Sequence, residues 1–344
     1  MNRDHNHHKG LFRRAAAVCL VGAMLISSVL YGLIGCDAPE PPDPASDGVL
    51  HVVVTSFPAE EFARAVLGDL LNGSGGEPVV LERLGKTGQD LHAFEPSAAD
   101  IRKLSGADIL ICIGSFAETW LDGAIRASGN RSLRVLSMTD VCELHEEEEL
   151  PGLGKHDHHH DHEHGEGTQV EYDEHVWTSF GNMARIVTAV RNTLTAALPE
   201  QAATLQANAA SYLLELDALR ADYQATVASA ADPVLVIADR YPFAYLMREL
   251  GVVCYAAFPG CSSETQASFY TQVMLTETVR DLHLPAVLYV DFGVASVADA
   301  VSRATGVPVR RLWSGQVASD TGLSYLDMLR ENLVSLRAAL GVTG

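Results

Sequence analysis

The regular part of the chain begins with LHVVVTS at residues 50–56, and three similar runs follow at PVVLERL (78–84), DILICIG (108–114) and LRVLSM (133–138). Each run is short and rich in Val, Ile and Leu, and helical stretches beginning near Ala59 and Ser97 separate them. Strands that alternate with helices indicate a parallel sheet with crossover helices. We therefore predict an α/β fold for this part of the chain.

A second alternating region follows a long helical stretch. Residues 180–230 are alanine-rich and helical in pattern, with an interruption at Pro199. The later strand-like runs are PVLVIAD (233–239), VVCYAAF (252–258), AVLYVDF (286–292) and VPVRRLW (307–313), and a final helix is expected at about 322–340. The predicted architecture is two α/β lobes, 49–178 and 231–344, joined by a long linking helix at 179–230. Ligands of such sheets bind at the carboxyl ends of the strands, so we expect a site in the interlobe cleft.

The N-terminus has the features of a secretory signal. Basic residues precede an apolar run from Ala15 to Ile34, which ends in LIGC at Cys36. This end resembles the bacterial lipobox, which predicts a lipoprotein signal peptide at 1–35 and lipidation of Cys36. Residues 36–48 are rich in proline and acid and would form a disordered tether. The alternative is a plain transmembrane anchor, because the run is nearly long enough to span a bilayer.

Composition restricts the class of partner. The formal charge is -20 and 47% of residues are hydrophobic, which suits an acidic domain with a large core. Such an acidic surface argues against nucleic acid as a binding partner and favours the attraction of cations. Four cysteines lie beyond Cys36, namely Cys112, Cys142, Cys254 and Cys261. An oxidising compartment would permit disulfides, but the pairing stays open, and a buried thiol is the alternative, above all for Cys112.

The most distinctive segment is KHDHHHDHEHG at residues 155–165, within an acidic insert at 145–168. Imidazole nitrogens suit zinc, copper, nickel and iron, and the interleaved acids add oxygen donors. The insert therefore predicts an auxiliary metal-binding loop, against the alternative of a solvated low-complexity loop or a tag. Its histidines are His156, His158, His159, His160, His162 and His164.

Two further histidines stand in motifs on either side of the insert, His92 in GQDLHAFEPS and His175 in YDEHVWTS. These motifs, together with FAYLMRELGV (243–252), GCSSETQAS (260–268) and SYLDMLRENLVSLRAAL (324–340), resemble in order those of the zinc and manganese solute-binding lipoproteins of ABC importers. The acidic histidine-rich insert is typical of the zinc-type members. The likeness covers nearly all of residues 50–340.

This resemblance implies a receptor that captures zinc, or manganese, and delivers it to a membrane permease driven by an ATPase. It implies a monomer, lipid-anchored on the extracytoplasmic face of the cell membrane, that is not an enzyme. His92 and His175 would be the first and second metal ligands. The other nitrogen of each ring needs an acceptor, for which Glu95, Asp173 and Glu174 are candidates, although the role we favour for these three is that of surface carboxylates. Phe94, Trp177 and Phe243 would wall the site, with core packing as the alternative.

The sequence departs from the family pattern in the second lobe. Arg240 stands where the family has its third histidine, and Trp313 stands where it has a late aspartate. A guanidinium stays protonated and cannot ligate zinc. The remaining candidates are Glu264, Asp291, Asp239 or water. We favour Glu264 first and Asp291 second, with an ordinary loop acid and a helix cap as their alternatives. Arg240 would hold a carboxylate or close the cleft through a salt bridge.

Two other classes of function stay open. A secreted zinc-dependent hydrolase would also use two histidines, a carboxylate and water, but the sequence contains neither H-E-x-x-H nor G-x-S-x-G. A zinc-buffering surface protein active in cell adhesion could use the same fold without a transporter. Nitrogen donors and the insert favour zinc over manganese.

Overall fold

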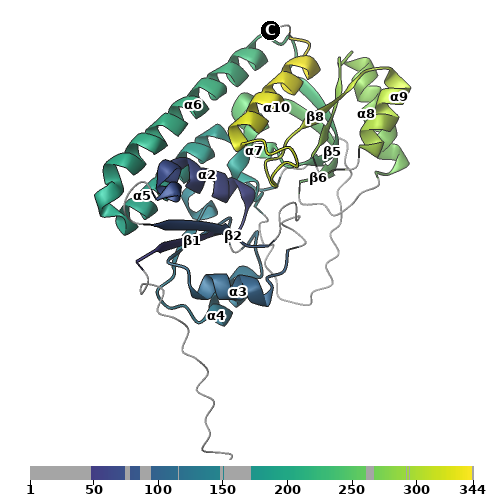
Figure 1. The fold of residues 1–344 in the computed structure, drawn as a ribbon. Helices are drawn as coiled ribbons and strands as arrows, with labels where there is room; N and C mark the ends of the chain where they lie inside the picture. The colour runs from purple at the N-terminus through teal and green to yellow at the C-terminus, as the bar shows by residue number, and fades with distance from the viewer. Residues whose placement is uncertain are drawn as a thin grey trace, which may run out of the picture. The chain divides into compact units, whose positions relative to one another are not determined.

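The computed structural model describes residues 48–73, 78–85, 94–114, 116–147, 150, 172–260, 267–291, 293 and 295–342. The first lobe contains a four-stranded parallel sheet of order β2-β1-β3-β4 (Figure 1). All four strands coincide with the predicted runs. They are β1 (Leu50–Val54), β2 (Val79–Arg83), β3 (Ile109–Cys112) and β4 (Arg134–Ser137).

The second lobe repeats this arrangement with a parallel sheet of order β6-β5-β7-β8. These strands also coincide with the predicted runs. They are β5 (Val234–Tyr241), β6 (Val253–Pro259), β7 (Val287–Val290) and β8 (Val309–Leu312). In each sheet the first strand of the lobe is central and its last strand is at one edge. The prediction of two parallel α/β lobes is therefore confirmed.

Helices connect the strands, and polar caps mark where several of them begin. Ser56 caps α2 (Phe57–Leu67) by accepting from the Ala59 amide, and Ser97 and Asp100 form a reciprocal capping box on α3 (Ala98–Ser105). The other crossover and terminal helices are α4 (Leu121–Ser128), α7 (Ala244–Leu250), α8 (Phe269–Asp281), α9 (Ser296–Thr305) and α10 (Tyr325–Ala339). No helix in these parts of the chain is long and apolar enough to cross a membrane.

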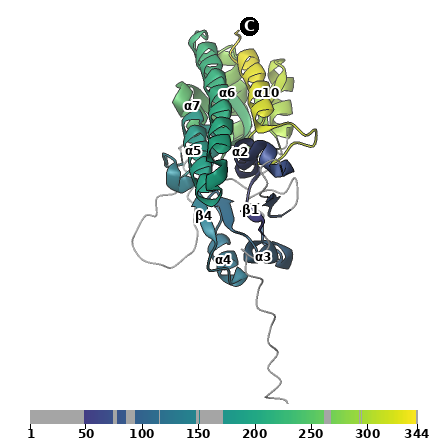
Figure 2. The same cartoon turned by 60° about the vertical axis from the view of Figure 1, so that its left-hand side comes forward.

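The segment at 179–230 forms two helices, where the sequence predicted one linking helix. They are α5 (Phe180–Ala197) and α6 (Ala202–Ala228). Pro199 lacks an amide hydrogen and disfavours helical geometry at Leu198, where ψ is 66°, so the helix ends there and restarts after a 3₁₀ turn. Figure 2 shows α6 beside α2 and α10, with which it packs. The helix α6 therefore contacts both lobes.

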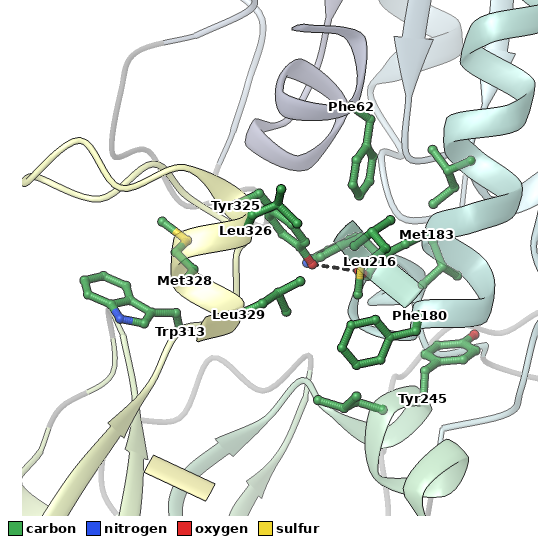
Figure 3. Packing of buried hydrophobic residues seen from close by; sticks show 14 of the residues in the cluster. Phe62, Phe180, Met183, Leu216, Tyr245, Trp313, Tyr325, Leu326, Met328 and Leu329 are labelled. Carbon is green, nitrogen blue, oxygen red and sulfur yellow. Dashed lines mark hydrogen bonds between the residues drawn. The ribbon is translucent and has the colours of Figure 1, made fainter. Parts of the chain in front are cut away.

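One apolar cluster is shared by the two lobes and the linking helices. Figure 3 shows Phe62 of α2, Met183 of α5, Leu216 of α6 and Tyr325 of α10 in this cluster. Each such side chain is almost fully buried, which stabilises the fold by about 1.5–3 kcal/mol per residue. Trp177 adds two hydrogen bonds between the lobes. Its indole N–H donates to Ser314 O at 3.0 Å, and its carbonyl accepts from the Tyr325 hydroxyl at 2.7 Å.

Candidate metal site

His175 lies at the end of the first lobe, directly before a 3₁₀ turn at Val176–Thr178, and is 1% exposed. Asp173, two residues earlier, accepts from the His175 amide at 2.8 Å and lies 2.7 Å from its ring Nδ1. A carboxylate acceptor puts the ring proton on Nδ1, which leaves the lone pair on Nε2, as a metal ligand requires. The local sequence D-x-H thus orients one imidazole for coordination.

The charge around His175 is negative. Burial alone lowers the pKa of His175, but the charge and hydrogen bond of Asp173, together with Glu174 and Glu147, raise it overall. Asp173 and Glu174 are 3% and 7% exposed, so the prediction that they are surface carboxylates is wrong for both. Glu95, the other candidate acceptor, is exposed. Cations are attracted to such an environment, and protons compete with metal for it.

The second lobe contributes a small cavity at the carboxyl ends of its strands. Its volume of about 20 Å³ would hold roughly one water molecule or a small ion. It is lined by Arg240, Pro242, Gly260, Val290, Asp291, Ser314, Gln316 and Val317. A Cβ atom added to Gly260 would lie 3.2 Å from His175 Cε1 and 2.8 Å from the Tyr241 carbonyl oxygen. Gly260 therefore lies between the cavity of the second lobe and the His175 imidazole of the first lobe. The sequence alone did not point to this glycine.

Asp291 follows β7 and presents a carboxylate to this cavity. Its Oδ1 accepts from the Ser314 amide, while Oδ2 is buried and has no hydrogen-bond partner among the described residues. Burial raises the pKa of Asp291 to about 6 despite the Ser314 hydrogen bonds. The alternative of a helix cap is wrong, because α9 begins at Ser296 with Ala295 at its cap position. A buried carboxylate oxygen without a donor suits a cation.

Asp239 and Arg240 occupy the end of β5. Asp239 accepts from the Arg240 amide at 2.8 Å and from the Val290 amide at 3.2 Å, so it fastens β5 to β7. Burial raises the pKa of Asp239 as well. Arg240 lines the cavity together with Asp291. This places a fixed positive charge beside the candidate ligand, and the predicted role of Arg240 in holding a carboxylate or closing the cleft stays a prediction.

The three aromatic residues expected to wall the site have different places. Trp177 is fully buried, and its ring centroid lies 5.2 Å from that of His175, so it flanks the imidazole. Phe243 is 2% exposed in the shared cluster. Phe94 packs edge-on against Trp120 at 4.8 Å in a separate cluster of the first lobe. All three side chains are packed in apolar clusters, and among the described residues Trp177 is the one of the three whose ring lies beside His175.

The histidine-rich insert leaves the fold at a closed stem immediately before His175. Glu146 and Tyr172 form an antiparallel bridge, and the Asp173 amide donates to His145 O at 3.0 Å. Tyr245 of α7 clamps the stem, because its hydroxyl accepts from the His145 amide and donates to Asp173 O at 2.7 Å. The described residues on either side of the insert therefore lie next to each other, immediately before His175.

Several predicted site residues lie outside the described residues. They are Cys36, His92, His156, His158, His159, His160, His162, His164 and Glu264. Within the described part of the chain, no three His, Cys, Asp or Glu side chains gather as a metal site. Cys112 and Cys142 are thiols, as the alternative for Cys112 predicted, and burial raises the pKa of Cys142 to about 12. Cys254 is buried in β6, and Cys261 lies outside the described residues.

Comparison with known proteins identifies the family. The model of the zinc-uptake complex component A, periplasmic (ZnuA), matches residues 52–339. The chain belongs to this family. It is 27% identical over 321 residues to the zinc-binding lipoprotein AdcA of Streptococcus pneumoniae, covering 92% of this chain but 60% of that protein. It is 26% identical over 300 residues to the high-affinity zinc uptake system protein ZnuA of Bacillus subtilis, covering 85% and 88% of the two chains.

Solved structures share the two-lobed fold. The Zn(II)-bound ZnuA-like domain of Streptococcus pneumoniae AdcA superposes with a TM-score of 0.66 at 24% identity, covering 85% of this chain and 99% of that one. The laminin-binding adhesin Lmb of Streptococcus agalactiae gives a TM-score of 0.69 at 20% identity, with coverage of 85% and 99%. At these identities the likeness establishes the fold. The chain spans about 60% of the length of AdcA.

Proposed function

We propose that this protein is the extracytoplasmic solute-binding component of an ABC importer that captures zinc and delivers it to a membrane permease and its ATPase. One observation carries the proposal: the buried imidazole of His175, oriented by Asp173, lies against Gly260 in the wall of a cavity that also contains the Asp291 carboxylate. Family membership supports it, because the matched relatives are named for zinc binding and zinc uptake.

The coordination shell we propose draws on both lobes. His92 and His175 would come from the first lobe, 49–178, and Asp291 and Glu264 from the second, 231–344. Two neutral imidazoles and two carboxylates give a four-coordinate site of the kind that zinc prefers. The insert histidines would form separate, weaker sites, and Cys36 would carry the lipid anchor in the cell membrane.

Zinc binding to a protein that lacks the insert tests the cleft. Deletion of residues 148–171 removes the insert histidines and joins the two sides of the stem. Zinc at a thousandfold excess over the dissociation constant should stabilise this protein by about 4 kcal/mol in thermal unfolding. His175→Asn should remove most of that stabilisation. His283→Asn is the matched control, since His283 is exposed in a turn with φ of 52°, which asparagine tolerates.

Further variants separate the ligand assignments and the classes of function. Asp291→Asn should weaken zinc binding without unfolding the protein, and Glu264→Gln tests the other carboxylate. An unchanged zinc response in His175→Asn would contradict the cleft site. Hydrolysis of ester or peptide substrates by the zinc-loaded protein would favour the hydrolase instead, and unimpaired zinc uptake in cells lacking the gene would favour the buffering adhesin.

A further inference from the structure

A second concave surface lies on the second lobe, between the edge strand β8 and helix α10. This groove has a volume of about 460 Å³ and is lined chiefly by Tyr289, Arg310, Arg311, Trp313, Glu331 and Val334. It shares no lining residue with the small cavity beside His175. The groove is therefore not part of the candidate metal site.

Arg311 is held in a fixed position in this groove. Its guanidinium carbon lies 4.6 Å from the centroid of the Trp313 ring and 5.9 Å from that of Tyr289, and its Nε donates to the Tyr289 hydroxyl at 2.9 Å. Neither terminal nitrogen of Arg311 has a hydrogen-bond partner among the residues that the structure describes. Stacking and the Nε bond restrict the side chain in advance, so a carboxylate could bind the two nitrogens at little entropic cost.

The backbone of β8 offers a second kind of contact. Among the described strands β8 pairs only with β7, and on that side the Pro308 and Leu312 carbonyls accept from the Val287 and Asp291 amides. Because backbone groups alternate in direction along a strand, Val309 and Arg311 direct their amides and carbonyls to the open edge. An extended chain can pair with such an edge as an added strand.

The positive charge of the groove favours an acidic ligand. Arg310 and Arg311 are exposed neighbours with no ion pair to any described residue, in a chain of formal charge -20. Glu331 on the α10 wall balances only one of them. A second copy pairing through β8 would bring two arginine pairs together, and an anionic membrane would be repelled by the acidic protein. Val334 in this groove is 66% exposed, and an apolar side chain of a bound peptide could cover it.

We propose that this groove binds an extended acidic peptide segment of a partner protein, which adds as a strand to β8 and pairs a carboxylate with Arg311. The backbone edge would supply affinity and the arginines would supply selectivity for acid. The proposal is independent of the metal site, and zinc binding is not required for it.

The test uses the full mature chain and a fluorescein-labelled peptide of four Glu-Val repeats, with fluorescence anisotropy at low and at physiological salt. We expect saturable binding that weakens with salt, and no binding of a matching Lys-Val peptide. The double variant Arg310→Glu/Arg311→Glu should bind roughly tenfold more weakly or worse, because two attractive contacts become repulsive. The control pair Arg126→Glu/Arg131→Glu, an equal charge change at two exposed positions of the first lobe, should bind like the wild type.

Any one of five results would overturn the proposal. Equal loss of binding in the control pair Arg126→Glu/Arg131→Glu and in the double variant would show a general charge effect. Undiminished binding of a Glu-Val peptide N-methylated at alternate amides, or equal competition by free glutamate or inorganic phosphate, would show an anion pocket without strand addition. Concentration-dependent dimerisation lost in the double variant, or binding to phosphatidylglycerol vesicles, would assign the edge to another occupant. An unchanged melting temperature in the double variant would show that the fold is intact.

Discussion

The buried acid Glu118 should make the metal-free protein lose stability as pH rises from about 4.5 to about 7. Glu118 lies after β3, is 3% exposed, and accepts from the Ile113 amide at 2.9 Å and the Gly114 amide at 3.2 Å. Burial raises its pKa from an ordinary value of 4.5 to about 7, with the nearby Glu174 carboxylate acting in the same direction. The difference between these two values corresponds to about 3 kcal/mol of unfolding free energy.

The direction follows from proton binding in the two states. Below pH 4.5 both the folded and the unfolded chain hold the Glu118 proton, and between 4.5 and about 7 only the folded chain does. The free energy of unfolding therefore falls as pH rises across this window and is constant above it. Glu118→Gln keeps an oxygen acceptor for the two amides and cannot ionise. Its stability relative to wild type should thus increase by about 3 kcal/mol between pH 4.5 and pH 8.

Urea unfolding of the zinc-free protein at several pH values measures this difference directly. Glu200→Gln, at an exposed position, should differ from wild type by a constant amount at every pH. A difference between Glu118→Gln and wild type that does not change with pH would refute the reasoning, because it would mean that Glu118 titrates alike in both states.

Three further predictions concern the site and its supports. Asp173→Asn should weaken zinc binding about 10- to 100-fold in calorimetry at neutral pH, since the acceptor that orients His175 loses its charge; an unchanged affinity would mean that Asp173 does not orient the ligand. Gly293→Ala should destabilise the fold by about 1–3 kcal/mol, because its methyl group would collide with the Asp239 carboxylate, whereas Gly123→Ala in α4, with open space around it, should stabilise by up to about 1 kcal/mol. Deletion of residues 148–171 should abolish weak zinc binding and leave one tight site, and loss of all tight binding would move the site to the insert.

The sequence predicted the inner strands of both sheets accurately because these parallel strands are largely buried on both faces. The four residues of β3 are all buried, and such a strand reads as a continuous apolar run. The packing of the linking segment could not be predicted from such runs. Its alanine-rich pattern gives the same helical signal on both sides of Pro199, and the packing of α6 against α2 and α10 depends on contacts more than a hundred residues apart. Periodicity gives no information about such contacts.

Asp173 shows what local sequence could have given. An acidic pair before a histidine resembles a solvated turn, and composition favours that interpretation. However, a carboxylate two residues before a histidine can reach both the following backbone amide and the ring, as Asp side chains do in turns. The D-x-H spacing could therefore have predicted an oriented imidazole from sequence alone. Only the burial of Asp173 and His175 could not be predicted without the structure.

Gly260 could not be predicted in this way, because its position beside the His175 ring exists only where the two lobes meet. Asp291 was predicted as a candidate ligand from its place at a strand end, but the fold was needed to show that one of its oxygens is buried without a partner among the described residues. A Cβ atom at position 260 would lie 2.8 Å from the Tyr241 carbonyl oxygen and 3.2 Å from His175 Cε1, so a side chain there would displace one or the other. Asp291 becomes a plausible ligand because Ser314 satisfies one of its oxygens and burial deprives the other of a donor. Both residues follow strands of one parallel sheet, so the rule that ligands bind at carboxyl ends locates them together although 31 positions separate them in the sequence. Arg240 lies at the end of a strand of the same sheet, and its positive charge beside Asp291 would oppose a cation there. The metal affinity that we propose would therefore depend on the carboxylates together with the His175 imidazole that Asp173 orients.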